Sequence, residues 1–177
     1  MSESWLVMPR GVNVGAANRV PMAALRTALA EAGFSGVKTV GQSGNIVVAA
    51  DGAGVADQVR AVIAGRFGVD APCVARGAAQ MAAVVAKNPL RAVADDPSRY
   101  LVLFFSVPPA PADVAAWAPP PPPEVALVDG EEAYVWHPDG LRAVRFQAPL
   151  PKGSPEAFAT GRNWRTVAKL AALLGSA

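Results

Sequence analysis

Short strand-like and helix-like segments alternate at the start of this chain in an order that few folds accommodate. The strand-like segments are short and apolar, while the helix-like ones repeat their apolar residues every three or four positions. In chain order the predicted elements are strand 4–8, helix 21–32, strand 37–40, strand 45–49, helix 55–67 and strand 72–75. The order βαββαβ is typical of a ferredoxin-like lobe. The sequence therefore predicts an α+β fold.

A second series of similar order begins at Tyr100. Its predicted elements are strand 100–107, a short helix 113–117, strands 125–128 and 133–137, and a helical stretch 155–159. We therefore expect two small ferredoxin-like lobes of the βαββαβ type, in the order of an internal duplication. A last helix is predicted from Trp164, with Asn163 as its N-cap and Gly175 as its stop. The expected organisation is a first lobe in residues 1–78, a helical connection in 79–98 and a second lobe in 99–177.

Eight prolines lie between Pro108 and Pro123, and the five from Pro119 to Pro123 are consecutive. Proline fixes φ and lacks a backbone N–H, so this run predicts an extended polyproline II segment. It has two interpretations, a ligand for an SH3-type domain or a stiff surface connection within the second lobe. The second is the commoner use of such a segment, and we favour it.

Composition limits the class of protein. The chain has 177 residues and is 52% hydrophobic, which is ample for a shared core. Its single cysteine, Cys73, cannot form an internal disulfide, and the first residues do not resemble a secretion signal. The longest apolar run, residues 101–107, is far shorter than the roughly 20 residues that cross a bilayer. We therefore expect a cytoplasmic protein with no membrane span.

Charge is distributed unevenly along the chain. Residues 51–140 carry six Lys/Arg against eleven Asp/Glu, whereas residues 141–177 carry six against one. A basic C-terminal stretch attracts anions or a nucleic-acid backbone, but it is also an ordinary solvated surface. The second interpretation is favoured, because nucleic-acid-binding domains usually show a stronger basic footprint.

Several common chemistries are absent from the sequence. Histidine occurs once, at His137, and cysteine once, so a zinc site of Cys and His is excluded and no metal or cofactor is expected. His137 follows a predicted strand and precedes Pro138, where a structural role is far commoner than a catalytic one. The loop RGVNVGAANR lacks both the Gly-Lys-Ser/Thr ending of a P-loop and the GxGxxG pattern.

Three segments are richer in glycine and polar side chains than a core requires: 10–19, 42–45 and 162–165. The first two should meet, because a crossover helix makes the first two strands of the lobe parallel and places the loops that follow them at the same end. We expect these segments to supply the donors of an anion-binding site, with Trp164 as a stacking or buried group. The predicted donors are Arg10, Asn13, Asn18, Arg19, Gln42, Ser43, Asn45, Arg162, Asn163 and Arg165.

Two helix starts support this prediction. The first helix begins at Pro21 after Val20, which has no capping side chain, so its free N–H groups form an anion site unless Asn18 folds back onto them. Arg162 and Arg165 are predicted at the start of the last helix, where cations oppose the helix dipole. The alternative is structural: the glycines and asparagines shape left-handed turns, and the arginines pair with the acidic middle of the chain.

The same segments carry a resemblance to a known family. RGVNVGAANRVPMAALR, GFSGVKTVGQSGNIVV, RFGVDAPCVAR, KNPL and GRNWRTVAKL, in this order, resemble the domain of unknown function 1697 family of small bacterial proteins. The resemblance implies two small α+β lobes of ferredoxin-like topology, no established activity and no catalytic residues to transfer. The chain departs from the family pattern in residues 141–160, where LRAVRFQAPLPKGSPEAFAT stands.

Three functional hypotheses follow. The preferred one is a non-enzymatic module that binds an anionic ligand, a nucleotide or a nucleic acid, at the loop end of the first lobe. The second is an enzyme that acts on a phosphorylated or carboxylated small molecule with arginine clamps and no metal. The third is an interaction or oligomerisation protein that uses exposed sheet edges or the proline run.

Overall fold

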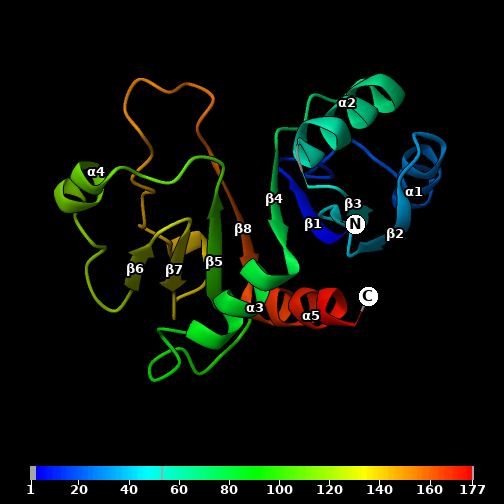
Figure 1. Ribbon diagram of the computed structural model, residues 1–177. Coiled ribbons are helices and arrows are strands. Elements are labelled where there is room, and N and C mark those ends of the chain that lie inside the picture. The colour runs from blue at the N-terminus through cyan, green and yellow to red at the C-terminus, as the bar shows by residue number, and fades with distance from the viewer. Residues whose placement is uncertain (1–2, 53, 177) are drawn as a thin grey trace. The chain divides into compact units, whose positions relative to one another are not determined.

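The computed structural model describes residues 3–52 and 54–176 and divides the chain into two compact units (Figure 1). Unit 1 comprises residues 1–84 and 170–177, and unit 2 comprises residues 85–169. Two helices, α3 (Ala78–Lys87) and α5 (Trp164–Gly175), cross the division. None of the helices in the described residues is long and apolar enough to span a membrane.

Unit 1 has the predicted βαββαβ order. Its elements are β1 (Glu3–Pro9), α1 (Met22–Glu31), β2 (Ser35–Val40), β3 (Asn45–Ala50), α2 (Val55–Phe67) and β4 (Cys73–Gly77). The four strands form an antiparallel sheet in the order β2-β3-β1-β4, which is the ferredoxin-like order.

The core of unit 1 lies between its sheet and two helices. The register pairs Val7 of β1 with Ile46 of β3, so both side chains lie on the same face of the sheet. Helix α1 buries Leu25 and Leu29, and α2 buries Ile63 in the same apolar cluster. Figure 1 shows α1 and α2 together on one face of this sheet.

Unit 2 repeats the strand order with different helices. Its elements are β5 (Tyr100–Phe105), α4 (Pro111–Ala116), β6 (Val125–Asp129), β7 (Glu132–Trp136), a 3-10 turn (Leu141–Ala143) and β8 (Ala159–Asn163). The sheet order is β6-β7-β5-β8, so each strand occupies the place of its counterpart in unit 1. Helix α4 buries no residue and, in Figure 1, stands away from the sheet.

The predicted helix 155–159 is wrong. These residues form a turn and the start of β8, and Ala157 N donates to the Ser154 carbonyl at 3.0 Å. Prolines cause the difference, because Pro149, Pro151 and Pro155 remove donors that a helix of this region needs and keep the preceding residues extended.

The proline run is only partly extended. Residues 119–121 have no regular hydrogen-bonded structure, but residues 122–123 form a turn with a cis peptide between Pro122 and Pro123. The prediction of an extended segment through all five prolines is therefore wrong at its last two residues, where the chain turns.

The last helix begins where the sequence indicates. Helix α5 starts at Trp164, and the Asn163 side chain caps it, with Thr166 N donating to Asn163 Oδ1 at 2.9 Å. Arg162, which was predicted at the helix start, lies instead in strand β8.

Candidate functional site

The two polar loops of unit 1 meet at one end of its sheet. Strands β1 and β2 both run antiparallel to β3 and therefore run the same way, so the loops that follow them emerge together. Asn13, in the first loop, donates from Nδ2 to the Gln42 carbonyl in the second at 2.8 Å. The predicted proximity of these loops is confirmed.

Asn13 fastens the first loop onto itself as well. Its Oδ1 accepts from Val20 N at 2.8 Å, and its Nδ2 donates to the Val20 carbonyl at 2.9 Å. The residue has a φ of 54°, in the left-handed region that asparagine tolerates better than most residues. One side chain therefore joins both ends of the loop to the neighbouring turn.

Asn18 does not cap the first helix. It also lies in the left-handed region, with a φ of 53°, and its Nδ2 donates to the Gly11 carbonyl at 3.1 Å. The residue before α1 is Pro21, which makes no side-chain capping hydrogen bond to the first turn. The N–H groups of this turn remain at the positive end of the helix dipole.

The Asn45 side chain forms hydrogen bonds within the protein. It is buried and donates from Nδ2 to the Val40 carbonyl at 2.8 Å and to Ser43 Oγ at 3.1 Å. These bonds close the β2–β3 turn. The predicted donors Asn45 and Ser43 thus shape the turn, and the exposed side chain of Gln42 stands beside them.

The meeting loops enclose a shallow hollow of about 220 Å³ that is lined by Asn13, Gly15, Arg19 and Gln42. Arg19 and Gln42 are exposed, as is Arg10 at the start of the first loop. Residues 9–21 and 41–45 contain no aspartate or glutamate. Guanidinium, amide and backbone N–H groups donate hydrogen bonds, so the chemistry of the hollow suits an anion.

The three predicted donors near the last helix belong to unit 2. Arg162 is buried in β8 and donates from Nη1 to Thr160 Oγ1 at 2.9 Å and to the Gly161 carbonyl at 2.8 Å. Burial lowers the pKa of Arg162 to about 10. Asn163 caps α5, and Arg165 is exposed on it. The structure therefore does not assign these residues to the hollow of unit 1.

Trp164 lies against Tyr100 within unit 2, with the ring centroids 4.8 Å apart and the planes 8° from parallel. Of the two roles predicted for it, the structure shows packing within the protein.

Unit 2 contains a pair of buried polar residues whose proximity was not predicted. Glu124 precedes β6 and His137 follows β7, and both are buried. The register pairs Val125 with Trp136, so these two flanking residues come to the same end of the hairpin. The signal in the sequence was the pair of neighbouring predicted strands, 125–128 and 133–137. Two strands joined by a short turn place their outer ends side by side.

Comparisons with known proteins agree on the fold and name no activity. The chain is similar over 98% of its length to 99% of a conserved bacterial protein, SP0830 from Streptococcus pneumoniae, with 21% identity and a TM-score of 0.75. No protein with a curated description matches the chain. Residues 2–134 match the family of proteins of unknown function DUF1697. The chain therefore belongs to the DUF1697 family.

Proposed function

We propose that this protein is a non-enzymatic module that binds an anionic ligand, a nucleotide or a single-stranded nucleic acid, in the hollow at the loop end of unit 1. The observation that carries the proposal is the clamp made by Asn13. By bonding Val20 and Gln42 together, it fixes a backbone from which Arg19 and Gln42 line the same hollow. Such a site is organised before the ligand arrives, which lowers the cost of binding.

Charge supports an anion as the ligand. The two loops contribute Arg10 and Arg19 and no carboxylate, and the uncapped start of α1 follows directly after the first loop. Helix N-termini and guanidinium groups are both common partners of phosphate in proteins. A cytoplasmic location is part of the proposal, because nucleotides and RNA are abundant there.

Binding is favoured over catalysis by the groups that line the hollow. A general base or nucleophile is needed for most reactions of small molecules. The hollow is lined by two amide side chains, a guanidinium and a glycine, none of which is a base or nucleophile at neutral pH.

The test is thermal unfolding in the presence of phosphate-bearing probes. ATP, GTP and an oligo(dT) single strand should each be added at millimolar or saturating concentration to the native chain and to Arg19→Ala. A ligand at about 100 times its Kd stabilises the fold by about 2.7 kcal/mol, so the melting temperature of the native chain should rise. In Arg19→Ala the rise should be largely lost.

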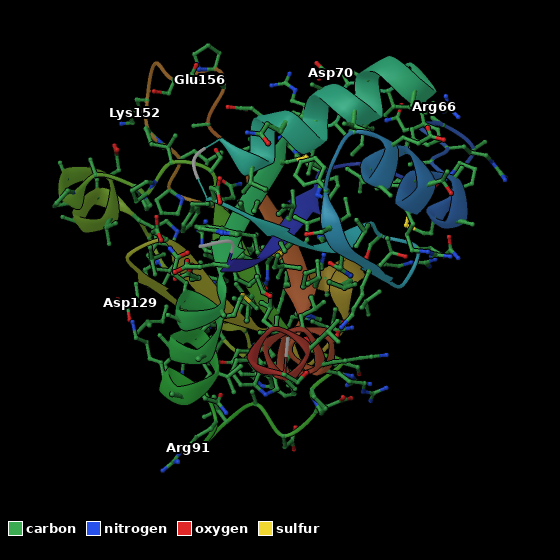
Figure 2. All side chains as sticks on the ribbon, turned by 45° about the vertical axis from the view of Figure 1, so that its right-hand side comes forward. Arg66, Asp70, Arg91, Asp129, Lys152 and Glu156 are labelled. Atoms are coloured by element: carbon green, nitrogen blue, oxygen red, sulfur yellow. The ribbon has the colours of Figure 1, made fainter. Side chains whose placement is uncertain are left out.

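Arg91→Ala is the matched control. Arg91 is an exposed arginine in unit 2 and points outward from the chain (Figure 2), so its removal changes the net charge equally without touching the hollow. The control should respond to the probes like the native chain. Equal loss of response in both variants would indicate non-specific charge attraction, and no response of the native chain to any probe would refute the proposal.

A further inference from the structure

The end of the β6–β7 hairpin in unit 2 holds a small cavity. It has a volume of about 10 Å³ and is lined by Glu124, His137, Pro138, Asp139, Gly140, Ala143 and Arg145. His137 is only 2% exposed and Glu124 only 5%. The cavity therefore joins a buried imidazole to a buried carboxylate.

Glu124 anchors the segment that covers this cavity. Its Oε2 accepts from Arg145 N and its Oε1 accepts from Phe146 N, each at 2.8 Å. At the other end of the segment, Gly140 N donates to the His137 carbonyl at 2.9 Å. Residues 138–146, which we call the cover segment, are thus attached to the hairpin through Glu124 and His137.

The imidazole of His137 lacks protein partners. Neither Nδ1 nor Nε2 makes a hydrogen bond within the described part of the chain, although both atoms are buried. Buried polar groups are normally satisfied, and one water requires about 10–15 Å³ together with two or more polar partners. The cavity has about that volume, with the imidazole and the carboxylate on its wall.

Charged groups face His137 from several elements. The backbone of His137 itself, Glu124 and Asp96 favour its protonation and Arg99 opposes it, while Asp139 and Arg145 line the same cavity. Burial is the largest influence and lowers the pKa of His137 below its ordinary value of 6.5. The neutral imidazole, with one donor and one acceptor, is the form that fits the site near neutral pH.

We propose that neutral His137 holds the cover segment in place through one internal water shared with Glu124, and that protonation of His137 releases this segment. Both oxygens of Glu124 already accept backbone N–H bonds from the segment. Protonation turns the acceptor nitrogen of the ring into a second donor. The imidazolium then either draws the Glu124 carboxylate toward itself, away from Arg145 N and Phe146 N, or moves out to water, because a buried charge that is not closely paired is costly. Either movement displaces the cover segment from the hairpin.

The experiment uses the fact that His137 is the only histidine in the chain, so that in tag-free protein a single imidazole signal reports it. Proton NMR between pH 8 and pH 4 gives its protonation, and hydrogen exchange, corrected for intrinsic pH dependence, gives the protection of the Arg145 and Phe146 amides. We expect a midpoint below 6.5 and a fall in both protections of about tenfold or more over the same pH interval. Amides of β5 should keep their protection.

His137→Gln is the second arm, because an amide side chain keeps a donor and an acceptor but does not titrate in this range. Protection of the two amides should then be independent of pH. Asp129→Asn, at the opposite end of the hairpin, where Asp129 pairs with Glu132, should behave like the native chain. A midpoint at or above 6.5, or protonation without a change in these two amides, would overturn the proposal. Should His137→Gln not fold, the native titration decides it alone.

Discussion

The two units place the same strand order under very different loops. In unit 1 the strand–helix loop after β1 contains Asn13 and Arg19, and the turn after β2 contains Gln42. In unit 2 the loop after β5 is residues 106–110, Ser-Val-Pro-Pro-Ala, and the turn after β6 is Gly130 and Glu131. Since the sheets share their topology, the proposed anion site depends on the loop residues of unit 1 and not on the fold alone.

The helices differ as much as the loops. Helix α1 has ten residues and buries four of them, whereas its counterpart α4 has six residues and buries none. Between β7 and β8 unit 2 has only the 3-10 turn, where unit 1 has the 13-residue α2. The two units therefore share their strand order although their helices pack very differently. Matched substitutions in the two units should change the free energy of unfolding by different amounts.

The largest difference is expected for Leu25→Ala in α1 against Val114→Ala in α4. Leu25 is fully buried in the core of unit 1, so its truncation should lower the free energy of unfolding by about 2–5 kcal/mol. Val114 is only half-buried on a helix without core residues, and its truncation should cost less than about 1 kcal/mol. Urea unfolding measures both. Equal losses would show that α4 packs as tightly as α1.

A smaller contrast is expected between Gly44→Ala and Gly130→Ala, in the equivalent hairpin turns. Both glycines have a positive φ, 76° and 61°. A Cβ on Gly44 would lie 2.9 Å from Val12 Cγ2, whereas one on Gly130 meets nothing within 4 Å. Gly130→Ala should therefore carry only the left-handed penalty of about 1–2 kcal/mol, and Gly44→Ala should exceed it. Equal unfolding midpoints for the two variants would show that the β1–α1 loop, which contains Val12, moves away from the new methyl group without a cost in stability.

Removing the clamp should have a moderate effect. Asn13→Gly keeps the residue's positive φ accessible and deletes the three side-chain hydrogen bonds to Val20 and Gln42. Because these bonds are only partly buried, we expect a loss of about 1–2 kcal/mol in the free energy of unfolding. Hydrogen exchange of the Val20 amide should rise with it. An unchanged Val20 amide would show that the backbone alone holds the loop.

The smallest effect is expected at the surface ion pairs. Asp70 accepts two hydrogen bonds from Arg60, at 2.6 and 2.9 Å, and this hydrogen bonding lowers the pKa of Asp70 below 3.8. The stability from the pair is present above 3.8 and is lost as the pH falls through the lower folded-state pKa. Asp70→Asn removes the titrating carboxyl, so the free energy of unfolding of this variant should fall less as the pH is lowered. Urea unfolding at a series of acidic pH values measures the difference. Asp129 of unit 2, which Figure 2 labels, forms one ion pair with Lys87, so Asp129→Asn should change stability less still. A larger change for Asp129→Asn would reverse this ranking.

The sequence was sufficient for the framework of unit 1. Its strands and helices alternate with clear periodicity, and the predicted helix 55–67 coincides with α2. The meeting of the loops could also be predicted, because parallel strands on either side of β3 place them at one end. What could not be predicted was which side chains point outward. Asn13 and Asn45 have the composition of ligand donors, but their bonds go to the protein's own backbone.

The second unit was harder to predict because prolines and long connections carry no periodicity. Residues 144–158 reach β8 without a helix, held in part by Glu124, whose partners lie more than 20 positions away in sequence. Arg162 was predicted at a helix start because it directly precedes the cap Asn163. The helix does begin at Trp164, but the sequence did not indicate the strand β8 in front of it, which carries Arg162 into the interior.

The most direct test of the central claim is a ¹H–¹⁵N NMR titration of the native chain with ATP. The account predicts saturable shifts in the amides of residues 10–24 and 41–45, and none in the equivalent loops of unit 2 at residues 106–110 and 130–131. Shifts spread equally over both sets of loops, or no saturable shift at all, would contradict the claim that the loops of unit 1 form an anion site.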